Sequence, residues 1–484
     1  MKKIVSIVIA LVVLVLGLWA GATYWVGAKA EQRYRSLLQQ ASQVQYLKFV
    51  NESYDRGFFG SKARTVIEVQ QPGAAAENQP IKLTLAHDIT HGPFPLSKSP
   101  DGKGQFKPLM AIIETGIMFS PETQSQLGEL YGQFPEIASI RDYTVIYLDG
   151  HGEEHLLFPA FQHTFGNEDK VAVDWKGLSL QVNFTADLKG FTGSLSVPGL
   201  EAVGKDGALK IREVKSAYNF HEGISGLSLG EASFDLAGLE FAEKKETESH
   251  AFLIRGLNAK TSNKESGDNI NFLIAVRTDQ VQLDEMQYGP GVFEMEFRNL
   301  DAASLVKLQQ TVRELQTQAA QQSSEQMQMM MLAKYGEILP GLLKKSPELE
   351  VTQLNIKSTD GDFTGKAKIA FDGTKSEAAQ NLLTLANAIT AQAEFKVAER
   401  LLRRAVSNTM KDKIIADRKE QEGVAPSDKE IDAIASPMID EQLNTLMEQN
   451  ILIKENGNYQ VSASYKAGEI VLNGRSLSLQ NLMQ

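Results

Sequence analysis

The feature that most constrains the fold is an alternation of apolar and polar residues that recurs through residues 49–300. Runs such as residues 65–69 and 178–182 repeat every second position. In an extended strand, successive side chains point to opposite faces, so each run predicts a strand with one buried face. Turn residues between runs, such as Asp149-Gly150, favour short hairpins over crossover helices. The region therefore predicts a meander of antiparallel strands and argues against a Rossmann-type fold.

The pattern changes from strand to helix at Asp301. Apolar residues then recur at spacings of three and four, which predicts an amphipathic helix with Asp301 as its N-cap. The positions of this stripe are Leu305, Leu308, Val312, Leu315 and Ala319. We expect the helix to end before Pro340, because proline interrupts helical hydrogen bonding.

Strands and helices alternate in the remainder of the chain. Period-two runs predict strands at 349–356, 363–371 and 391–397. Capping-box patterns that begin at Thr374 and Ser427 predict helices between 375 and 450, and Ser120-Pro121 predicts an earlier helix over 120–133. Asn456-Gly457 between apolar runs predicts a closing hairpin.

These patterns together predict an α+β fold, in which an extended antiparallel sheet carries an appended helical section. We expect an N-terminal signal anchor over 1–28 and a helical stalk over 29–48. A mostly β domain would follow over 49–300. A mixed helical and β domain over 301–484 would close the chain. At about 100 to 200 residues per domain, a chain of 484 residues suits several domains.

The N-terminal segment predicts one transmembrane helix, because residues 4–28 carry no charge. As a helix it would be about 37 Å long, against about 30 Å for a hydrocarbon core. Lys2 and Lys3 precede it, which favours a cytoplasmic N-terminus and an exported bulk. The residues expected to form the anchor, with aromatic rings at its far end, are Ile4, Leu14, Leu18, Trp19, Tyr24 and Trp25.

A cleaved signal peptide is the alternative for the same segment, since Ala20-Gly21-Ala22 has the small-residue form of a cleavage site. We favour a retained anchor for two reasons. The apolar run is longer than the usual ~7 to 15 residues, and it continues beyond the cleavage site over 23–28.

Composition excludes several functional classes. The chain has 49 Lys+Arg against 60 Asp+Glu, a net charge of −11, which argues against binding nucleic acid through phosphate neutralisation. It has no cysteine, so disulfides, thiolate metal sites and cysteine nucleophiles are absent. We expect no cofactor.

Four segments are familiar in combination. They are residues 54–61 (YDRGFFGS), 91–96 (HGPFPL), 297–301 (FRNLD) and 465–474 (YKAGEIVLNG). With the preceding anchor they resemble the YdgA family of Gram-negative bacteria over nearly the whole chain. The resemblance implies an inner-membrane protein with its bulk in the periplasm. It implies no reaction, because the family is defined as a domain of unknown function.

Two segments have the residue patterns of catalytic motifs but not the secondary structure that those motifs require. His151 and His155 match the His-x-x-Glu-His pattern of inverted zincins, which needs a helix, whereas Asp149-Gly150 and Gly152 favour a hairpin. The Gly-x-Ser-x-Gly pattern at 226–230 needs a strand-to-helix turn, and an alternating strand pattern follows it. We expect no metal at the first segment and no nucleophile at the second.

Two other clusters remain candidates for contact surfaces or packing. His87 and His91 would share one strand face about 13 Å apart, too far for one metal, and we expect Phe94 to plug the core beyond them. Five residues form an apolar cluster that either offers an adaptable surface or fills gaps in a core. They are Met327, Met329, Met330, Met331 and Leu332.

No catalytic constellation follows from the sequence, so the leading hypothesis is a non-enzymatic periplasmic binding or scaffold protein, which meets membrane lipid through its anchor. The second is a lipid or hydrophobic-ligand handler with AsmA-like architecture by analogy. The third is a periplasmic hydrolase. A continuous apolar groove would favour the second, a filled core would favour the first, and a water-accessible cluster of histidines and carboxylates would favour the third.

Overall fold

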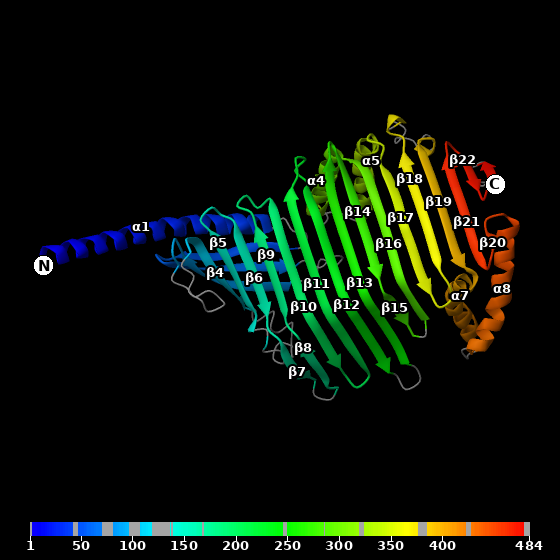
Figure 1. Cartoon of the computed structure of the whole chain (residues 1–484), viewed down its shortest axis with the longest axis horizontal. Helices are drawn as coiled ribbons and strands as arrows, with labels where there is room; N and C mark the ends of the chain where they lie inside the picture. The colour runs from blue at the N-terminus through cyan, green and yellow to red at the C-terminus, as the bar shows by residue number, and fades with distance from the viewer. Residues whose placement is uncertain are drawn as a thin grey trace. The chain divides into compact units, whose positions relative to one another are not determined.

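A computed structural model describes residues 2–41, 47–69, 81–95, 107–118, 136, 139–166, 169–244, 249–284, 286–318, 324–375, 385–422 and 427–478. The chain divides into two units, Met1–His221 and Glu222–Gln484. The division falls within the region of recurring strand patterns. Figure 1 shows long strands side by side in each unit.

The first unit consists of one long helix and a meandering sheet. Its elements are α1 (Lys2–Ala41), β1 (Leu47–Arg56), β2 (Gly60–Val69), β3 (Ile81–His91), β4 (Leu109–Met118), β5 (Arg141–Tyr147), β6 (Gly152–Phe158), β7 (Phe161–Phe165), β8 (Val171–Trp175), β9 (Leu178–Phe184), β10 (Gly190–Val203) and β11 (Gly207–Glu222). Antiparallel pairs join β1 to β6 in chain order, and β6 then pairs with β9, β9 with β10 and β10 with β11. The predicted antiparallel meander is confirmed.

The second unit contains the helical section. Its elements are β12 (Ser228–Lys244), β13 (Ser249–Ser266), β14 (Asn269–Thr278), β15 (Gln280–Leu283), β16 (Met286–Asp301), α4 (Ala302–Gln318), α5 (Ser324–Leu343), β17 (Glu348–Ser358), β18 (Phe363–Phe371), β19 (Ile389–Ala398), α7 (Glu399–Glu422), α8 (Asp428–Glu448), β20 (Ile453–Glu455), β21 (Asn458–Lys466), β22 (Glu469–Leu472) and β23 (Arg475–Ser478). Antiparallel pairing runs β12–β13–β14–β16–β17–β18–β19–β21–β22–β23. The coarse α+β prediction, mostly antiparallel sheet with a few helices, is confirmed.

The change of period at Asp301 coincides with the start of α4. The Asp301 carboxylate accepts a hydrogen bond from the Ser304 backbone N–H at 2.8 Å, as an N-cap does. Leu315 is buried on the predicted stripe, while Ala319 lies outside the described residues. In Figure 1, α4 and α5 lie at the upper ends of the strands, and α7 and α8 lie toward the lower ends of the last strands.

The expected helix end before Pro340 is wrong, because α5 continues through Pro340 to Leu343. Proline at this position removes the hydrogen bond that its backbone N–H would donate within the helix, so the local sequence disfavours the last turn. This turn also packs closely on α4, since a Cβ added to Gly341 would lie 2.4 Å from Ser304 Oγ. Tertiary contact therefore holds a turn that the local sequence disfavours.

Two local sequence signals in the C-terminal part, a helix cap and a hairpin turn, are confirmed. Glu430 accepts a hydrogen bond from the Ser427 backbone N–H at 2.8 Å, which forms the predicted capping contact of α8. Asn456 and Gly457 adopt φ +49° and +74° in the turn between β20 and β21, as a tight hairpin requires. The helices expected after Thr374 and over 120–133 lie outside the described residues.

Helix α1 is continuous from the predicted anchor into the segment that we expected as a stalk. Its second half lies on the sheet of the first unit, where Ala30 and Tyr34 pack with Ala63 and Ile89 in one buried cluster. Within the described residues, no helix is long and apolar enough to span a membrane.

Candidate functional site

Helix α1 covers one face of strands β2–β4, and the contact is close. A Cβ added to Gly27 would lie 2.4 Å from the Nδ1 atom of His91, so only glycine leaves room for this ring. His91 is buried and its Nε2 lies 2.8 Å from Ser61 Oγ. The expectation that Phe94 plugs the core is wrong, because Phe94 is exposed and His91 takes the buried place.

A chain of hydrogen-bonded side chains lies under the same helix. Tyr34 Oη lies 2.6 Å from Thr65 Oγ1, and Thr65 Oγ1 lies 2.8 Å from His87 Nε2. The other ring nitrogen of His87 lies 3.0 Å from Thr115 Oγ1. His87 and Thr115 are direct partners across β3 and β4. The chain thus crosses from α1 over three adjacent strands.

Two carboxyl groups extend this polar layer across β5 and β6. Asp142 is the cross-strand partner of Thr115, and Glu154 lies opposite Thr144, which shares a face of β5 with Asp142. Burial, and then the negative charge of Asp142, raises the pKa of Glu154 from 4.5 to about 7. Burial lowers the pKa of His87 from 6.5 to about 4 and raises that of Asp142. The layer therefore favours the neutral forms of its groups.

The layer is better suited to holding the fold together than to chemistry. Both nitrogens of His87 are engaged by threonine hydroxyls, and Thr65 is fully buried beneath α1. Helix α1 covers Thr65, whereas His87, Thr115 and Asp142 also line a cavity on the sheet. Perturbed pKa values mark functional sites in many enzymes, but structural polar layers also produce them.

Charged side chains of both signs line a cavity of about 980 Å³ on strands β1–β5. The charged residues are Asp55, Lys62, Arg64, Asp88, Glu114, Arg141 and Asp142. Three cationic side chains lie among four carboxyl groups, so the cavity has no strong charge of one sign that would select an anion or a cation.

The sheet of the second unit has one apolar face. Direct cross-strand partners lie on the same face, and one row of partners crosses eight strands. From β12 to β21 this row is Phe234, Ala259, Val276, Phe293, Leu354, Gly365, Phe395 and Val461. The next row on that face, from β12 to β21, is Ala232, Thr261, Ile274, Met295, Val351, Ala367, Ala393 and Ala463. We call these two rows the apolar stripe.

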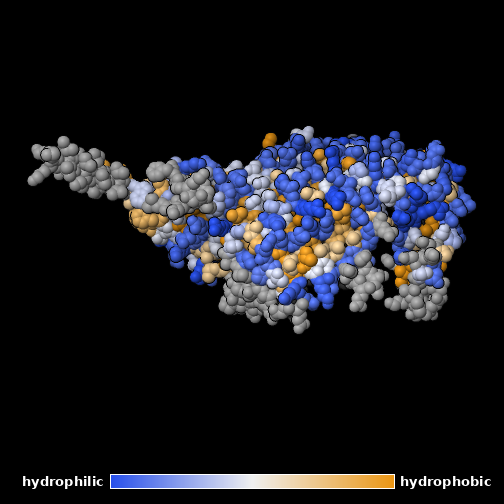
Figure 2. All heavy atoms as spheres, turned by 60° about the horizontal axis from the view of Figure 1, so that its bottom comes forward, coloured by the Kyte–Doolittle hydropathy of each residue, from blue (hydrophilic) through white to orange (hydrophobic). Residues whose placement is uncertain are grey.

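Helices cover the margins of this face and leave the stripe itself half-buried. Leu305 of α4 packs with Phe272, beyond one side of the stripe. Helices α7 and α8 pack on Val397 and Tyr459, beyond the other side. The larger side chains of the stripe are half-buried, and Phe234 is 38% exposed. Figure 2 shows that hydrophobic residues reach the surface among hydrophilic ones.

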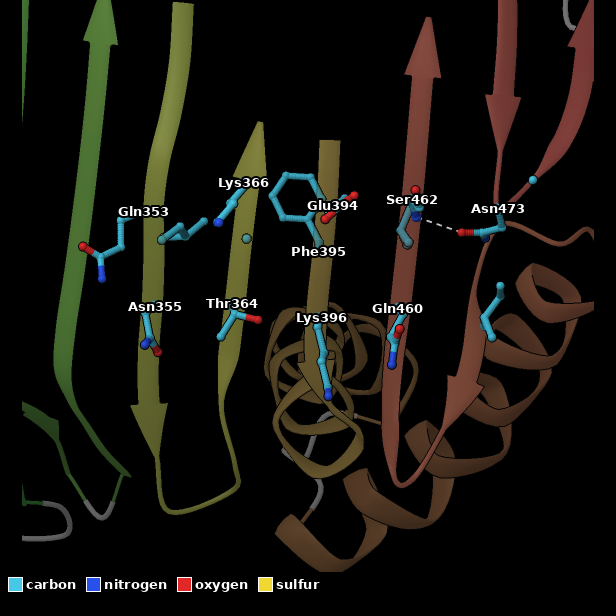
Figure 3. A pocket seen from close by; sticks show the side chains of 15 residues that line it. Gln353, Asn355, Thr364, Lys366, Glu394, Phe395, Lys396, Gln460, Ser462 and Asn473 are labelled. Atoms are coloured by element: carbon cyan, nitrogen blue, oxygen red, sulfur yellow. Dashed lines mark hydrogen bonds between the residues drawn. The ribbon is translucent and has the colours of Figure 1, made fainter. Parts of the chain in front are cut away.

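The opposite face of the same strands is polar. A cavity of about 700 Å³ lies at β17, β18, β19 and β21. It is lined by polar side chains and also by Leu354, Phe395 and Val461 of the apolar stripe, and Figure 3 shows the lining side chains. One cross-strand row in it consists of Asn355, Thr364, Lys396 and Gln460. These groups offer hydrogen bonds but no cluster of catalytic type.

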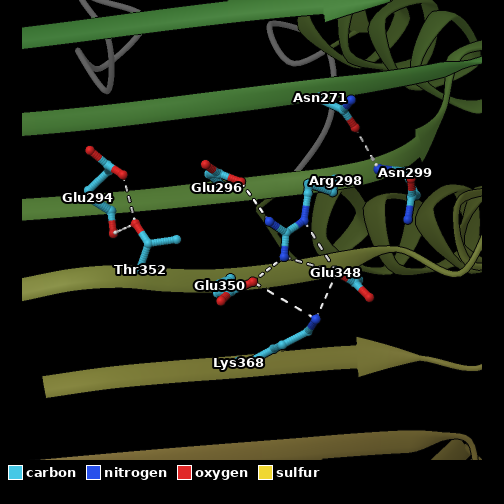
Figure 4. A network of polar contacts seen from close by, with 9 residues as sticks. All are labelled: Asn271, Glu294, Glu296, Arg298, Asn299, Glu348, Glu350, Thr352 and Lys368. Carbon is cyan, nitrogen blue, oxygen red and sulfur yellow. Dashed lines mark hydrogen bonds and ion pairs between the residues drawn. The ribbon is translucent and has the colours of Figure 1, made fainter. Parts of the chain in front are cut away.

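An ion-pair network lies on this polar face, on β16–β18 (Figure 4). Arg298 contacts Glu296 at 2.7 Å and Glu348 at 3.1 Å, and it also pairs with Glu350. Lys368 lies 3.0 Å from Glu348. Hydrogen bonds from Lys368 and then Arg298 hold the pKa of Glu348 below its ordinary value. Each of the three carboxylates is paired with Arg298, and Glu348 also with Lys368, which marks the network as a structural feature.

Comparison with known proteins gives the family. The bacterial family described as a protein of unknown function, DUF945, matches residues 1–480. The chain belongs to this family. A relative from Haemophilus influenzae, described as an uncharacterized protein, is 22% identical over 332 residues, which cover 64% of this chain and 85% of the relative. No solved structure matches this DUF945 chain.

The motif-like segments of this DUF945 chain have the local structures that we expected. His155 lies on β6, and His151 directly precedes that strand. The two imidazoles stack on Tyr143 and Tyr147 of β5, at centroid distances of 4.6 and 4.1 Å respectively. The Gly-x-Ser-x-Gly segment passes from a turn into β12 instead of a helix. Whether the histidines bind metal stays a prediction.

The methionine cluster lies on α5, as far as it is described. Met329 and Leu332 are exposed, whereas Met327, Met330 and Met331 are half-buried. Their use as a contact surface stays a prediction.

Sequence reasoning missed the polar layer and the continuity of the apolar stripe. Inward positions of β2, β3 and β4 carry Thr65, His87 and Thr115, so polar residues at expected core positions were the available signal. The sequence did place His87 and His91 on one face, and this is confirmed by the contacts of both rings with β2.

Proposed function

We propose that this protein is a non-enzymatic, membrane-anchored protein of the cell envelope that binds the hydrocarbon part of lipids on its apolar stripe. The observation that carries the proposal is the stripe itself, two apolar rows across eight strands that α4, α5, α7 and α8 leave half-buried.

The dimensions and energetics of the stripe suit an acyl chain. Eight strands at about 4.8 Å spacing give a length of about 34 Å, comparable with the ~30 Å hydrocarbon core of a bilayer. Each methylene group removed from water contributes about 0.8 kcal/mol, so a chain laid along the stripe would gain affinity along its whole length. The polar face opposite would not gain in this way, because its side chains are polar or ion-paired.

The location of the protein is part of the same proposal. An uncharged segment over 4–28 after Lys2 and Lys3 supports a single-pass inner-membrane anchor with a cytoplasmic N-terminus and a periplasmic bulk. We also propose that, within DUF945, the protein belongs to the YdgA family. An anchored protein would meet its lipid at the membrane surface, where the lipid is abundant.

A binding assay with full-length protein tests the proposal. The protein would be purified in detergent, incubated with a photoactivatable fatty acid, and the cross-linked peptides identified by mass spectrometry. We expect cross-links in β12, β14, β16 and β19, and a severalfold loss of labelling in Phe234→Glu. The matched control is Ile453→Glu on β20, because Ile453 is 42% exposed and Phe234 38% exposed. Ile453 is the cross-strand partner of Gln460, which lies in the polar row.

Two results would contradict the proposal. Equal labelling of both variants would show that the stripe is not the binding surface. Recovery of a stoichiometric protein partner, with no lipid co-purifying, would favour the scaffold role instead.

A further inference from the structure

An exposed aromatic cluster joins helix α1 to the tip of the first hairpin. Phe58 and Phe59 form the turn between β1 and β2. The ring of Phe59 stacks on Trp19 at a centroid distance of 5.3 Å, and the ring of Phe58 lies 5.9 Å from that of Tyr24. All of these rings except Trp19 are exposed, as is Trp25 beside them in sequence. We call Trp19, Tyr24, Trp25, Phe58 and Phe59 the aromatic collar.

The hairpin tip is held in a defined place on the helix. Arg56 donates a hydrogen bond to Tyr24 Oη at 3.2 Å, and its guanidinium lies 5.2 Å from the centre of that ring. It also pairs with Glu31 at 3.4 Å. Within the turn, the Gly57 N–H donates to the Gly60 carbonyl at 2.8 Å. The exposed rings are therefore presented by a braced hairpin.

The collar lies at the level where the uncharged part of α1 ends. Among the described side chains of α1, Thr23 is the first that is fully buried, so the uncharged residues 4–22 precede the buried part of the helix. Nineteen helical residues span about 28 Å, close to the ~30 Å hydrocarbon core. Charged residues begin at Lys29, roughly 9 Å beyond Thr23 along the helix.

We propose that the β1–β2 hairpin tip, with Phe58 and Phe59, inserts into the lipid–water interface of the membrane that α1 crosses. The inference rests on the proposed anchoring and adds a second point of contact. Aromatic rings favour the interfacial zone, and large exposed apolar patches on a folded surface mark sites of interaction. The uncharged helix continues directly into the collar, which identifies the bilayer as the occupant of this surface.

Two points of contact restrain the orientation of the first unit. A helix alone would leave the sheet free to turn about the helix axis. With the hairpin tip also in the interface, the face of β2–β4 that packs on α1 takes one direction relative to the membrane. The close contact of Gly27 with His91 transmits this restraint from helix to sheet.

The absence of native cysteine allows a direct test with single-cysteine variants. Full-length Phe59→Cys, Leu148→Cys and Leu14→Cys proteins would each carry a nitroxide label in vesicles of bacterial phospholipid. Leu148 is the matched control, since it is 45% exposed against 51% for Phe59. It lies in the β5–β6 turn, where the Gly150 carbonyl accepts a hydrogen bond from Arg33 at 2.8 Å. Arg33 is about 13 Å along the helix from Tyr24, on the side away from the anchor.

Spin-label collision rates with oxygen and with a water-soluble nickel complex then give the depth of each label. We expect the Phe59 label to favour oxygen severalfold more than the Leu148 label, and the Leu14 label to favour it most. A Phe58→Cys label serves as a second reporter if the Phe59 variant is misfolded by circular dichroism. If Leu14 is in hydrocarbon but both hairpin labels match Leu148, the hairpin inference is wrong and the anchor stands. If Leu14 is in water, the anchoring and the inference both fail.

Discussion

Replacing Glu154 by glutamine should make the first unit more stable at pH 8 and leave it unchanged near pH 4.5. Burial and the charge of Asp142 raise the pKa of Glu154 in the fold from 4.5 to about 7. Below pH 4.5 the carboxyl is protonated in both the folded and the unfolded chain. As pH rises from 4.5 to 7, the unfolded chain loses this proton and the folded chain keeps it, so stability falls. Above pH 7 the whole penalty is present.

The size of the effect follows from the pKa. The change from 4.5 to about 7, at about 1.36 kcal/mol per pH unit, corresponds to about 3 kcal/mol as an upper value. Glu154 is half-buried, so screening by water reduces this to ~2 kcal/mol. For a unit of this size, ~2 kcal/mol shifts the melting temperature by about 4 to 8 °C. Glutamine carries no charge and avoids the penalty at every pH.

Tryptophan fluorescence measures this effect in the full-length protein. The three tryptophans, Trp19, Trp25 and Trp175, all belong to the first unit, so their signal reports its unfolding. Melting curves of the protein in detergent would be recorded from pH 4.5 to 8. The control is Glu153→Gln, which removes the same charge from the adjacent position on the opposite face of β6. It should leave the pH dependence in place.

The reasoning is refuted if the difference in melting temperature between Glu154→Gln and the unsubstituted protein is the same at every pH. That result would mean that Glu154 is hydrated in the folded state.

Three further changes test other parts of the structure. Gly27→Ala should cost ~1 to 3 kcal/mol in the same fluorescence melt, because the new Cβ would lie 2.4 Å from the His91 ring; an unchanged curve would contradict this packing. Arg298→Gln should lower protection from hydrogen exchange in β16 and β17 by about 1 kcal/mol, and less so in 1 M salt; a loss independent of salt would exclude an electrostatic cause. Hydrogen exchange at the amide of exposed Leu332 should slow when phospholipid vesicles are added. The amide of buried Ile338 should be protected with and without vesicles. High protection at Leu332 without lipid would indicate that this part of α5 is packed in the fold.

Several features of the fold could be predicted because they depend on residues close in sequence. Period two marks the strands, the N-cap at Asp301 marks the start of α4, and Asn456-Gly457 marks the last turn. In each case the free energy is decided by contacts within a few residues. Sequence reasoning thus gave the strand-to-helix order and the α+β class, but it assigned no functional site.

Tertiary structure decided which side chains meet. Thr65, His87 and Thr115 are more than twenty residues apart in sequence, and only the strand register brings them into hydrogen-bond distance. The apolar stripe likewise exists because seven strand pairings align residues from Phe234 to Val461. Register depends on long-range burial, since a slip of one residue would exchange the two faces of a strand. Local sequence carries the alternation, but the pairing of strands determines whether that alternation becomes a polar layer or a continuous apolar surface.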